Sequence, residues 1–217
     1  MNDTEGFVGY LPSDNSIYVA FRGSLSIQNW ITDLNIDKVK YKTRPECNCQ
    51  VHEGFYNATL SVFDAVLAEV KRLKALYPNY SVKTTGHSLG GAIAQLTAME
   101  LINAGIDTTM INFGQPRVGD EDYAAFSNNF LKVQYRVVHN RDIVPHNPGQ
   151  IWPLNFKHCY YEEFEDKNGN VRQCDNSGED KTCSDGIDPL FYSIPDHLQY
   201  LGKCMGVLCE ECGILSD

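Results

Sequence analysis

The sequence predicts an α/β protein with a mostly parallel central sheet flanked by helices. Helical and strand-like segments alternate along the chain after residue 56, which is typical of parallel sheets with crossover helices. A β-branched run at residues 82–85 leads into a glycine-rich turn and then into good helix formers at residues 92–101. Two strand-like runs near the N-terminus flank a Pro-Ser-Asp-Asn turn, so an antiparallel hairpin should make the sheet mixed.

The individual elements follow from local patterns. Apolar residues recur at helical spacing over residues 56–77, and Pro78 ends that run. Acidic residues at the start of the segment 120–130 suit the first turn of a helix, where the helix dipole favours negative charge. In chain order we expect strands at 6–11 and 17–21, a short helix within 25–34, a surface loop at 38–50, a helix at 56–77, a strand at 82–85, a helix at 92–101, a strand at 110–113, a helix at 120–130, a strand at 134–139 and a polar hairpin within 162–184.

Length and charge restrict the kind of protein. A chain of 217 residues can bury one sizeable core, and we expect one domain over residues 1–217. The net charge of −10, with no dense cluster of lysine and arginine, argues against a nucleic-acid partner and against charge-driven binding to anionic membranes. No apolar run reaches the ~20 residues of a transmembrane helix.

The eight cysteines favour an oxidising compartment, and we expect a secreted, extracellular protein. Three Asn-X-Ser/Thr sequons are compatible with that location. The first five residues lack a basic and an apolar region, so no signal peptide is expected in this chain. Cys204, Cys209 and Cys212 suggest a zinc site as a competing interpretation, but a fourth ligand is missing. We expect no metal and no cofactor.

The turn at residues 86–90 has the sequence Gly-His-Ser-Leu-Gly and lies between a predicted strand and a predicted helix. This is the context of a nucleophile elbow, in which the serine occupies a strained turn with its hydroxyl available. Gly86 and Gly90 would remove the Cβ atoms that otherwise clash where strand and helix cross. The alternative is an ordinary glycine-rich turn, which the fit on both sides disfavours. Ser88 is therefore the candidate nucleophile.

A serine nucleophile needs a base and an acid that orients the base. His197 lies beyond all the predicted strands, and Asp142 stands just past the end of the strand at 134–139. Together with Ser88 they follow the chain order Ser, Asp, His of α/β-hydrolases. Asp196 is a weaker candidate acid, because the side chains of adjacent residues diverge. On its own, each of Asp142 and His197 would more often be a structural residue than a catalytic one.

Seven ordered motifs resemble the class 3 lipases of fungal type, and the resemblance covers residues 7 to 201. The motifs are FRGS at 21–24, NWI at 29–31, VHEGF at 51–55, TGHSLGG at 85–91, GQPRVG at 114–119, RDIVP at 141–145 and DHLQY at 196–200. The resemblance implies an α/β-hydrolase fold and a secreted triacylglycerol lipase with no cofactor.

The resemblance also assigns roles to individual residues. It implies that Ser88, Asp142 and His197 form the triad. It also implies an oxyanion hole formed by Ser24 and the backbone N–H of Leu89. Family members usually carry a further N-terminal helix and strand, which this chain lacks. A family disulfide corresponds to Cys174 and Cys183, whereas the pairing of the other six cysteines stays open.

The segment 25–34 begins directly after Ser24. Its apolar residues fall on one stripe of a short helix, and the resemblance supports a lid at this position. A helix that packs permanently on the core is the alternative. The four residues of the stripe, which we expect to contact substrate, are Ile27, Trp30, Ile31 and Leu34.

The sequence thus predicts a serine carboxylic-ester hydrolase, foremost a triacylglycerol lipase that acts at an oil–water interface. A feruloyl or other soluble-ester esterase has the same fold and triad, because specificity depends on the pocket and lid. A lipid-binding protein without catalysis would not need the serine, aspartate and histidine set. Acyl-chain length and positional preference are not encoded in any recognisable motif.

Overall fold

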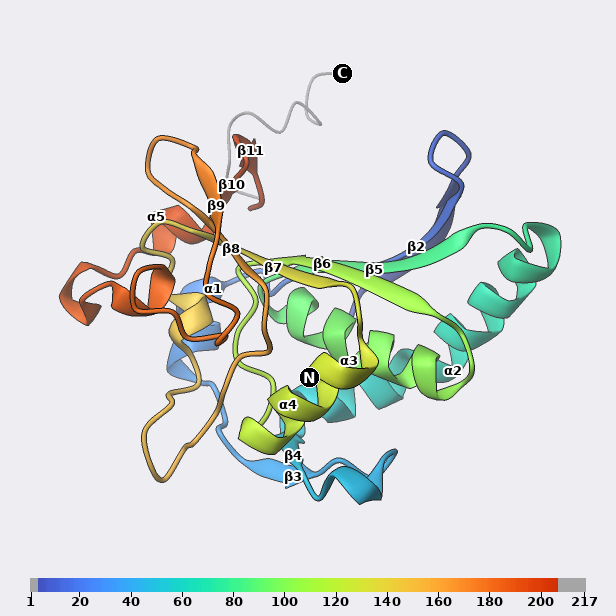
Figure 1. Ribbon diagram of the computed structural model, residues 1–217, viewed down its shortest axis with the longest axis horizontal. Helices are drawn as coiled ribbons and strands as arrows, with labels where there is room; N and C mark the ends of the chain where they lie inside the picture. Colours follow the sequence, from blue (N-terminus) through green and yellow to red (C-terminus); the bar gives the residue numbers. More distant parts are fainter. Residues whose placement is uncertain (1–3, 207–217) are drawn as a thin grey trace.

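A seven-stranded sheet forms the centre of the computed structural model, which describes residues 4–206. Its strands have the order β1-β2-β5-β6-β7-β8-β9 (Figure 1). The five inner strands run parallel, and β1 and β9 pair antiparallel at the two edges. The strands are β1 Gly6–Leu11, β2 Ser16–Phe21, β5 Ser81–His87, β6 Thr108–Phe113, β7 Gln134–His139, β8 Glu162–Glu165 and β9 Val171–Gln173.

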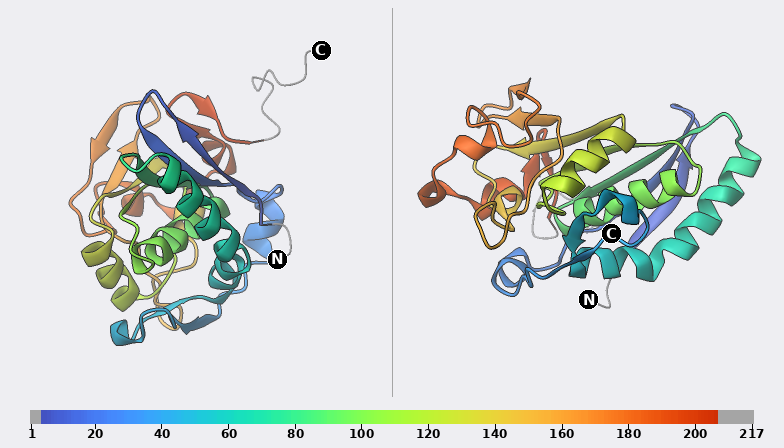
Figure 2. Two further views of the ribbon diagram at one scale, coloured as in Figure 1. Left: turned by 90° about the vertical axis from the view of Figure 1, so that its right-hand side faces the viewer. Right: turned by 60° about the horizontal axis from the view of Figure 1, so that its bottom comes forward.

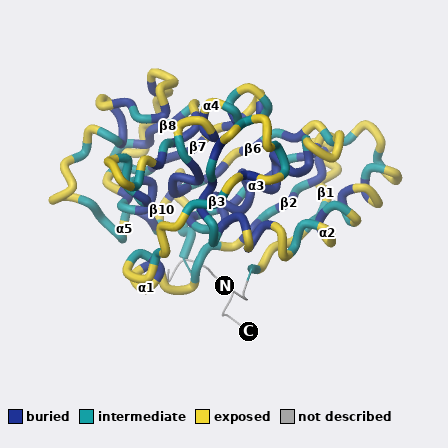
Figure 3. The backbone as a smooth tube through the Cα atoms, turned by 90° about the horizontal axis from the view of Figure 1, so that it is seen from below, coloured by how far each residue is buried: buried dark blue, intermediate teal, exposed yellow. Residues whose placement is uncertain are grey.

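Three helices cover one face of this sheet (Figures 1 and 2). They are α2 Glu53–Leu76, α3 Leu89–Asn103 and α4 Glu121–Phe130. Residues of β5 alternate between buried and half-buried positions, as expected for a strand with one face on the core. Helix α3 is buried along almost its entire length, because it lies between the sheet and α2 (Figure 3). The expected mixed α/β sheet with flanking helices is confirmed.

The carboxyl ends of the parallel strands meet at one end of the molecule, where loops and two short helices gather (Figure 1). Helix α1, Ile27–Thr32, follows β2. Helix α5, Ile194–His197, precedes a small hairpin of β10 Gln199–Tyr200 and β11 Lys203–Cys204. In open α/β sheets this end usually carries the functional site.

The prediction of a surface loop at residues 38–50 is wrong. Strands β3 Lys38–Lys40 and β4 Gln50–His52 pair antiparallel and enclose the 3₁₀ helix η1, Pro45–Cys47. Tyr41 and Cys49 of this hairpin are buried in the same apolar cluster as α2 and α3. Short strands of three residues interrupted by proline carry little periodic signal, and tertiary packing defines them.

Two disulfides are present among the described residues. Cys174 and Cys183 are joined across nine positions next to the β8–β9 hairpin, and Cys47 is joined to Cys49. Cys159 is buried and free. The cysteines Cys209 and Cys212 lie outside the described residues. Within residues 4–206 no helix is long and apolar enough to span a bilayer.

Candidate active site

The turn between β5 and α3 places Ser88 at a sharp corner of the backbone. Ser88 has φ 58° and ψ −130°, a conformation that costs a non-glycine residue free energy. A Cβ on Gly90 would lie 2.2 Å from the carbonyl oxygen of Phe21, and one on Gly86 would lie 2.3 Å from the backbone of Gly90. The two glycines therefore allow β5, the end of β2 and α3 to approach closely enough to hold this turn.

Asp142 and His197 are brought together from two different loops. Asp142 lies three residues beyond β7, and His197 is the last residue of α5. Their side chains are both fully buried, and Asp142 Oδ2 lies 2.7 Å from His197 Nδ1. A bridge between Asp142 and Ser193 fixes the two loops relative to each other. This contact leaves His197 Nε2 as the nitrogen that points away from the carboxylate.

Two further hydrogen-bond donors hold the carboxylate of Asp142, and a glycine leaves room for it. Its Oδ1 accepts a hydrogen bond from the backbone N–H of Val144 at 2.8 Å. Its Oδ2 also accepts a short hydrogen bond from the hydroxyl of the buried Tyr200. A Cβ on Gly114 would lie 2.8 Å from Oδ2 and 2.9 Å from His197 Nδ1, so only glycine fits against this pair. Tyr200 and the Val144 N–H were not among the predicted site residues.

His87, the residue before the serine, supports His197 from the other side. The two rings lie 4.3 Å apart between centroids, and His87 Nε2 is 2.7 Å from the backbone carbonyl oxygen of His197. Burial, together with the neighbouring His197, lowers the pKa of His87 to about 4. His87 is therefore neutral near pH 7 and can donate a hydrogen bond from Nε2 to that carbonyl.

The weaker candidate acid, Asp196, is engaged elsewhere. Its Oδ2 accepts hydrogen bonds from the Asn140 amide at 2.9 Å and from the backbone N–H of Arg141 at 3.2 Å. These contacts join α5 to the loop that follows β7. Asp196 thus helps to hold the two loops together, and Asp142 is the carboxylate that contacts the His197 ring.

Two polar atoms remain unpaired in this buried cluster. Ser88 Oγ and His197 Nε2 have no hydrogen-bond partner among residues 4–206, although both side chains are fully buried. Buried polar atoms are normally paired, and unpaired ones call for an explanation. The hydroxyl and the nitrogen are the two atoms that would exchange a proton if Ser88 attacked a substrate.

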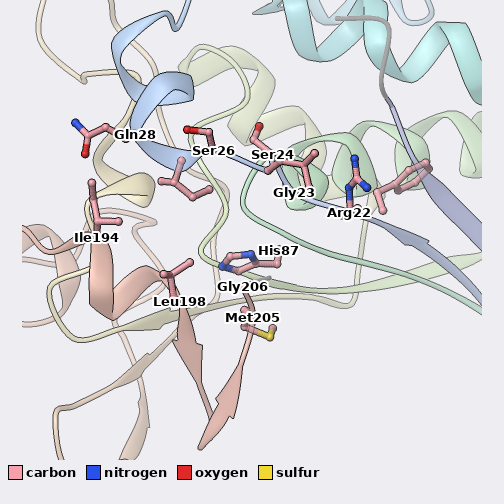
Figure 4. A pocket seen from close by; sticks show the side chains of 13 residues that line it. Arg22, Gly23, Ser24, Ser26, Gln28, His87, Ile194, Leu198, Met205 and Gly206 are labelled. Atoms are coloured by element: carbon pink, nitrogen blue, oxygen red, sulfur yellow. The ribbon is translucent and has the colours of Figure 1, made fainter. Parts of the chain in front are cut away.

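Of the two residues expected at the oxyanion hole, Leu89 directly follows the serine and Ser24 lies on another loop. Leu89 is the first residue of α3, so its N–H belongs to the helix end that has no internal partner. Ser24 lies in the loop between β2 and α1 (Figure 4). It borders an apolar cavity of about 340 Å³ that is also lined by His87, Ile194 and Leu198. The cavity lies beside Ser24 and α1, and Ser88 itself does not line it.

Helix α1 borders this cavity and turns its apolar stripe inward onto the core. Ser26 caps the helix by accepting a hydrogen bond from the Asn29 N–H. Ile27 and Trp30 are each only 9% exposed, and the Trp30 ring stacks on Phe55 with centroids 6.3 Å apart. The other two stripe residues, Ile31 and Leu34, pack half-buried against the same core cluster.

Potential metal ligands do not gather at this site. In the part of the chain that the structure describes, the one cluster of possible ligands consists of Glu162, Cys174 and Cys183. The two sulfur atoms are joined in a disulfide, so neither is available as a thiolate. The candidate site instead combines a hydroxyl, an imidazole and a carboxylate in a sheet-supported turn, which defines the class of α/β-hydrolases.

The comparisons identify the family within this class. The profile described as lipase (class 3) matches residues 18–152. The chain belongs to the class 3 lipase family.

Named relatives agree with this assignment. The lipase of Rhizomucor miehei is 38% identical over 212 residues, which cover 94% of this chain and 57% of that protein. A secreted mono- and diacylglycerol lipase of Fusarium solani is 34% identical and covers 84% of this chain and 54% of its own length. The solved structure of Rhizomucor miehei triacylglyceride lipase superposes with a TM-score of 0.86 at 38% identity, over 94% of this chain and 78% of that one. The chain thus spans about half the length of the curated relatives that it matches.

Proposed function

We propose that this chain is a serine carboxylic-ester hydrolase, foremost a triacylglycerol lipase, with Ser88 as the nucleophile. The observation that carries the proposal is the buried pair of Asp142 and His197, whose Oδ2 and Nδ1 atoms lie 2.7 Å apart. It occurs together with a serine on a strained strand-to-helix turn. The names of the relatives support a lipid ester as the substrate.

In the proposed reaction His197 Nε2 takes the proton of Ser88 as Oγ attacks the ester carbonyl carbon. The carboxylate of Asp142 holds the proton of His197 on Nδ1 and stabilises the imidazolium that forms. His197 then gives its proton to the leaving alcohol, and an acyl ester remains on Ser88. A water molecule repeats these steps and releases the fatty acid.

The negative charge on the carbonyl oxygen needs donors that are already in place. We assign the backbone N–H of Leu89 and the hydroxyl of Ser24 to this role, which is worth about 3 kcal/mol for each donor. The N-terminal end of α3 adds a favourable partial positive charge at the same place. No metal ion takes part in this scheme.

Helix α1 acts as a lid in this proposal. With the stripe turned inward, the Trp30 Nε1–H is buried and has no hydrogen-bond partner among the described residues, which costs about 1–3 kcal/mol. Turned outward at an oil surface, the same stripe would be in contact with lipid. A lipid surface would take up the side chains that the core buries in the closed state, so it can shift the population towards the open state. The substrate partner is accordingly a lipid ester at an oil–water interface, in an extracellular setting.

Two measurements test this function. A serine-directed organophosphate should label Ser88 in a 1:1 ratio and abolish ester hydrolysis, and Ser88→Ala should be unlabelled and inactive yet folded. A pH-stat assay should show faster release of acid from an emulsified triglyceride than from a dissolved feruloyl ester. A higher rate on the feruloyl ester would favour the soluble-ester esterase, and labelling of another residue would contradict the assigned nucleophile. Binding of lipid without any hydrolysis would favour a non-catalytic lipid-binding protein.

A further inference from the structure

Two loops hold large apolar side chains out into solvent. Leu190 is 88% exposed, Ile151 is 82% exposed and Trp152 is 79% exposed, which makes them the three most exposed large hydrophobic residues among residues 4–206. Phe191, next to Leu190, is also exposed. Single exposed apolar residues are normal on a protein surface, whereas adjacent pairs on loop tips call for a reason.

Both pairs lie at the end of the molecule that carries the candidate active site. Ile151 and Trp152 belong to the loop that follows β7 and the 3₁₀ helix η2, Val144–His146. Leu190 and Phe191 belong to the 3₁₀ helix η4, Pro189–Phe191, directly before α5. Figure 1 places these two segments at the same end of the sheet as α1.

Internal contacts hold the two loops in place. The Gln150 amide donates to Asp185 Oδ1 at 2.5 Å and so joins one loop to the other. The buried guanidinium of Arg117 donates to the carbonyl oxygens of His146 and Pro148 at 2.7 and 3.0 Å. Lys38 Nζ donates to the carbonyl oxygen of Leu154 at 2.7 Å. The loop with Ile151 and Trp152 is therefore held at both ends, and Asp185 joins it to the segment that leads to Leu190 and Phe191.

The charges around the tips indicate which surface they fit. Residues 148–156 contain no charged side chain. Near the other tip, the Asp188 side chain caps η4 by accepting a hydrogen bond from the Leu190 N–H at 2.9 Å. With a net charge of −10, the protein gains nothing from an anionic membrane. Tryptophan is also the residue that prefers a boundary between water and lipid.

We propose that Ile151, Trp152, Leu190 and Phe191 form an anchor that inserts into the surface of a neutral lipid aggregate while α1 is still closed. This inference rests on the proposed function, which places a lipid ester at the same end of the protein. The anchor differs from the lid stripe, because Ile27 and Trp30 are buried in the closed state. Docking through the anchor would bring α1 to the lipid surface before the helix opens.

The chain has two tryptophans, Trp30 and Trp152, so a variant without Trp30 allows a direct test of the anchor. In the Ser88→Ala, Trp30→Phe variant, Trp152 is the remaining tryptophan and reports on the anchor alone. Its fluorescence should shift to the blue and be quenched by brominated lipid when droplets of triolein coated with phosphatidylcholine are added. An unchanged spectrum at droplet concentrations that capture the protein would overturn the proposal.

Partition of the protein to the same droplets measures how much the anchor contributes to lipid binding. In the Ser88→Ala background, Trp152→Ser combined with Leu190→Ser should weaken flotation with the droplets about 100-fold, roughly tenfold for each side chain. Leu76→Ser is the matched control, because Leu76 is 59% exposed but lies at the end of α2, which leads to the amino end of β5. The control should partition like the parent. Equal partition of the anchor variant and the control would contradict the anchor.

Activity separates this inference from the proposed function. In the background with Ser88 intact, the anchor variant should lower the ratio of emulsion rate to dissolved-ester rate at least tenfold. An unchanged ratio would contradict the anchor but not the proposed hydrolase function. Anchor-dependent flotation without hydrolysis of any ester would contradict the proposed hydrolase function and support the anchor. Preferential capture by anionic vesicles, or a dimer that the anchor variant disrupts without any effect on flotation, would contradict a neutral lipid surface as the occupant.

Discussion

The floor and the cover of the candidate site are built in different ways. The floor is the turn between β5 and α3, where glycines leave no room for a Cβ and Ser88 is held at φ 58°. The proposed cover is α1, six residues whose apolar side chains pack on the core. The comparison teaches that the turn at Ser88 is fixed by backbone packing, whereas α1 is held by apolar side-chain contacts, which lipid would replace in the lid opening that we propose.

The largest expected effect comes from adding one methyl group to the floor. Gly90→Ala would place a Cβ 2.2 Å from the carbonyl oxygen of Phe21, and because both atoms belong to packed backbone, neither can move easily. We expect a loss of at least ~3 kcal/mol in the free energy of unfolding, or no folded protein. Urea denaturation measures this effect. Gly9→Ala is the control, since its nearest neighbour is the Phe7 ring at 3.7 Å, and it should change stability by less than about 0.5 kcal/mol.

The next effect concerns the acid that orients the imidazole. Asp142→Asn keeps the shape of the side chain but presents an amide to His197 Nδ1, so kcat on a dissolved ester should fall about 10⁴-fold. Asp196→Asn is the matched control next to His197, because that carboxylate contacts Asn140 and Arg141 instead. Steady-state kinetics should show less than a tenfold change for the control. A similar loss in both variants would mean that the acid is wrongly assigned.

Acid should lower the stability of the folded protein. Burial lowers the pKa values of His52, His87 and His146 to about 4, whereas the unfolded chain titrates near 6.5. Between these values the unfolded state binds more protons, so the free energy of unfolding falls as the pH decreases from 6.5 to 4. Each histidine can account for up to about 3 kcal/mol. Buried Glu100, whose pKa is raised by burial, opposes this in part.

Urea titrations at pH 7 and pH 4.5 check the acid effect. The midpoint of unfolding should be clearly lower at pH 4.5. Equal midpoints would show that these histidines are accessible to protons in the folded protein.

The smallest effect concerns the hydroxyl of Tyr200. Tyr200→Phe removes one hydrogen bond to Asp142 Oδ2, but His197 Nδ1 and the Val144 N–H remain in place. We expect kcat to fall about 3- to 10-fold while KM stays the same. A loss as large as that of Asp142→Asn would mean that Tyr200 is indispensable for holding the carboxylate.

Local sequence signals predicted the turn at Ser88 better than the residues that pack around the site. The turn at Ser88 is encoded within 12 residues, because β-branched residues, glycines and helix formers follow one another directly. Asp142 and His197 could be predicted as candidates from their place after the strands. Tyr200 could not, because its contact with Asp142 spans 58 positions and depends on the path of the β10–β11 hairpin. The hairpin of β3 and β4 was missed for a similar reason, since packing of Tyr41 and Cys49 defines it.

The difference between floor and cover is tested most directly by the rate on a short-chain triglyceride across its solubility limit. The pH-stat rate of the unaltered protein should rise disproportionately once droplets form, because the oil surface favours the outward position of α1. Trp30→Ala should weaken that rise more than it weakens hydrolysis of the dissolved ester. Smooth saturation through the solubility limit, with Trp30→Ala lowering both rates equally, would contradict a cover that lipid opens.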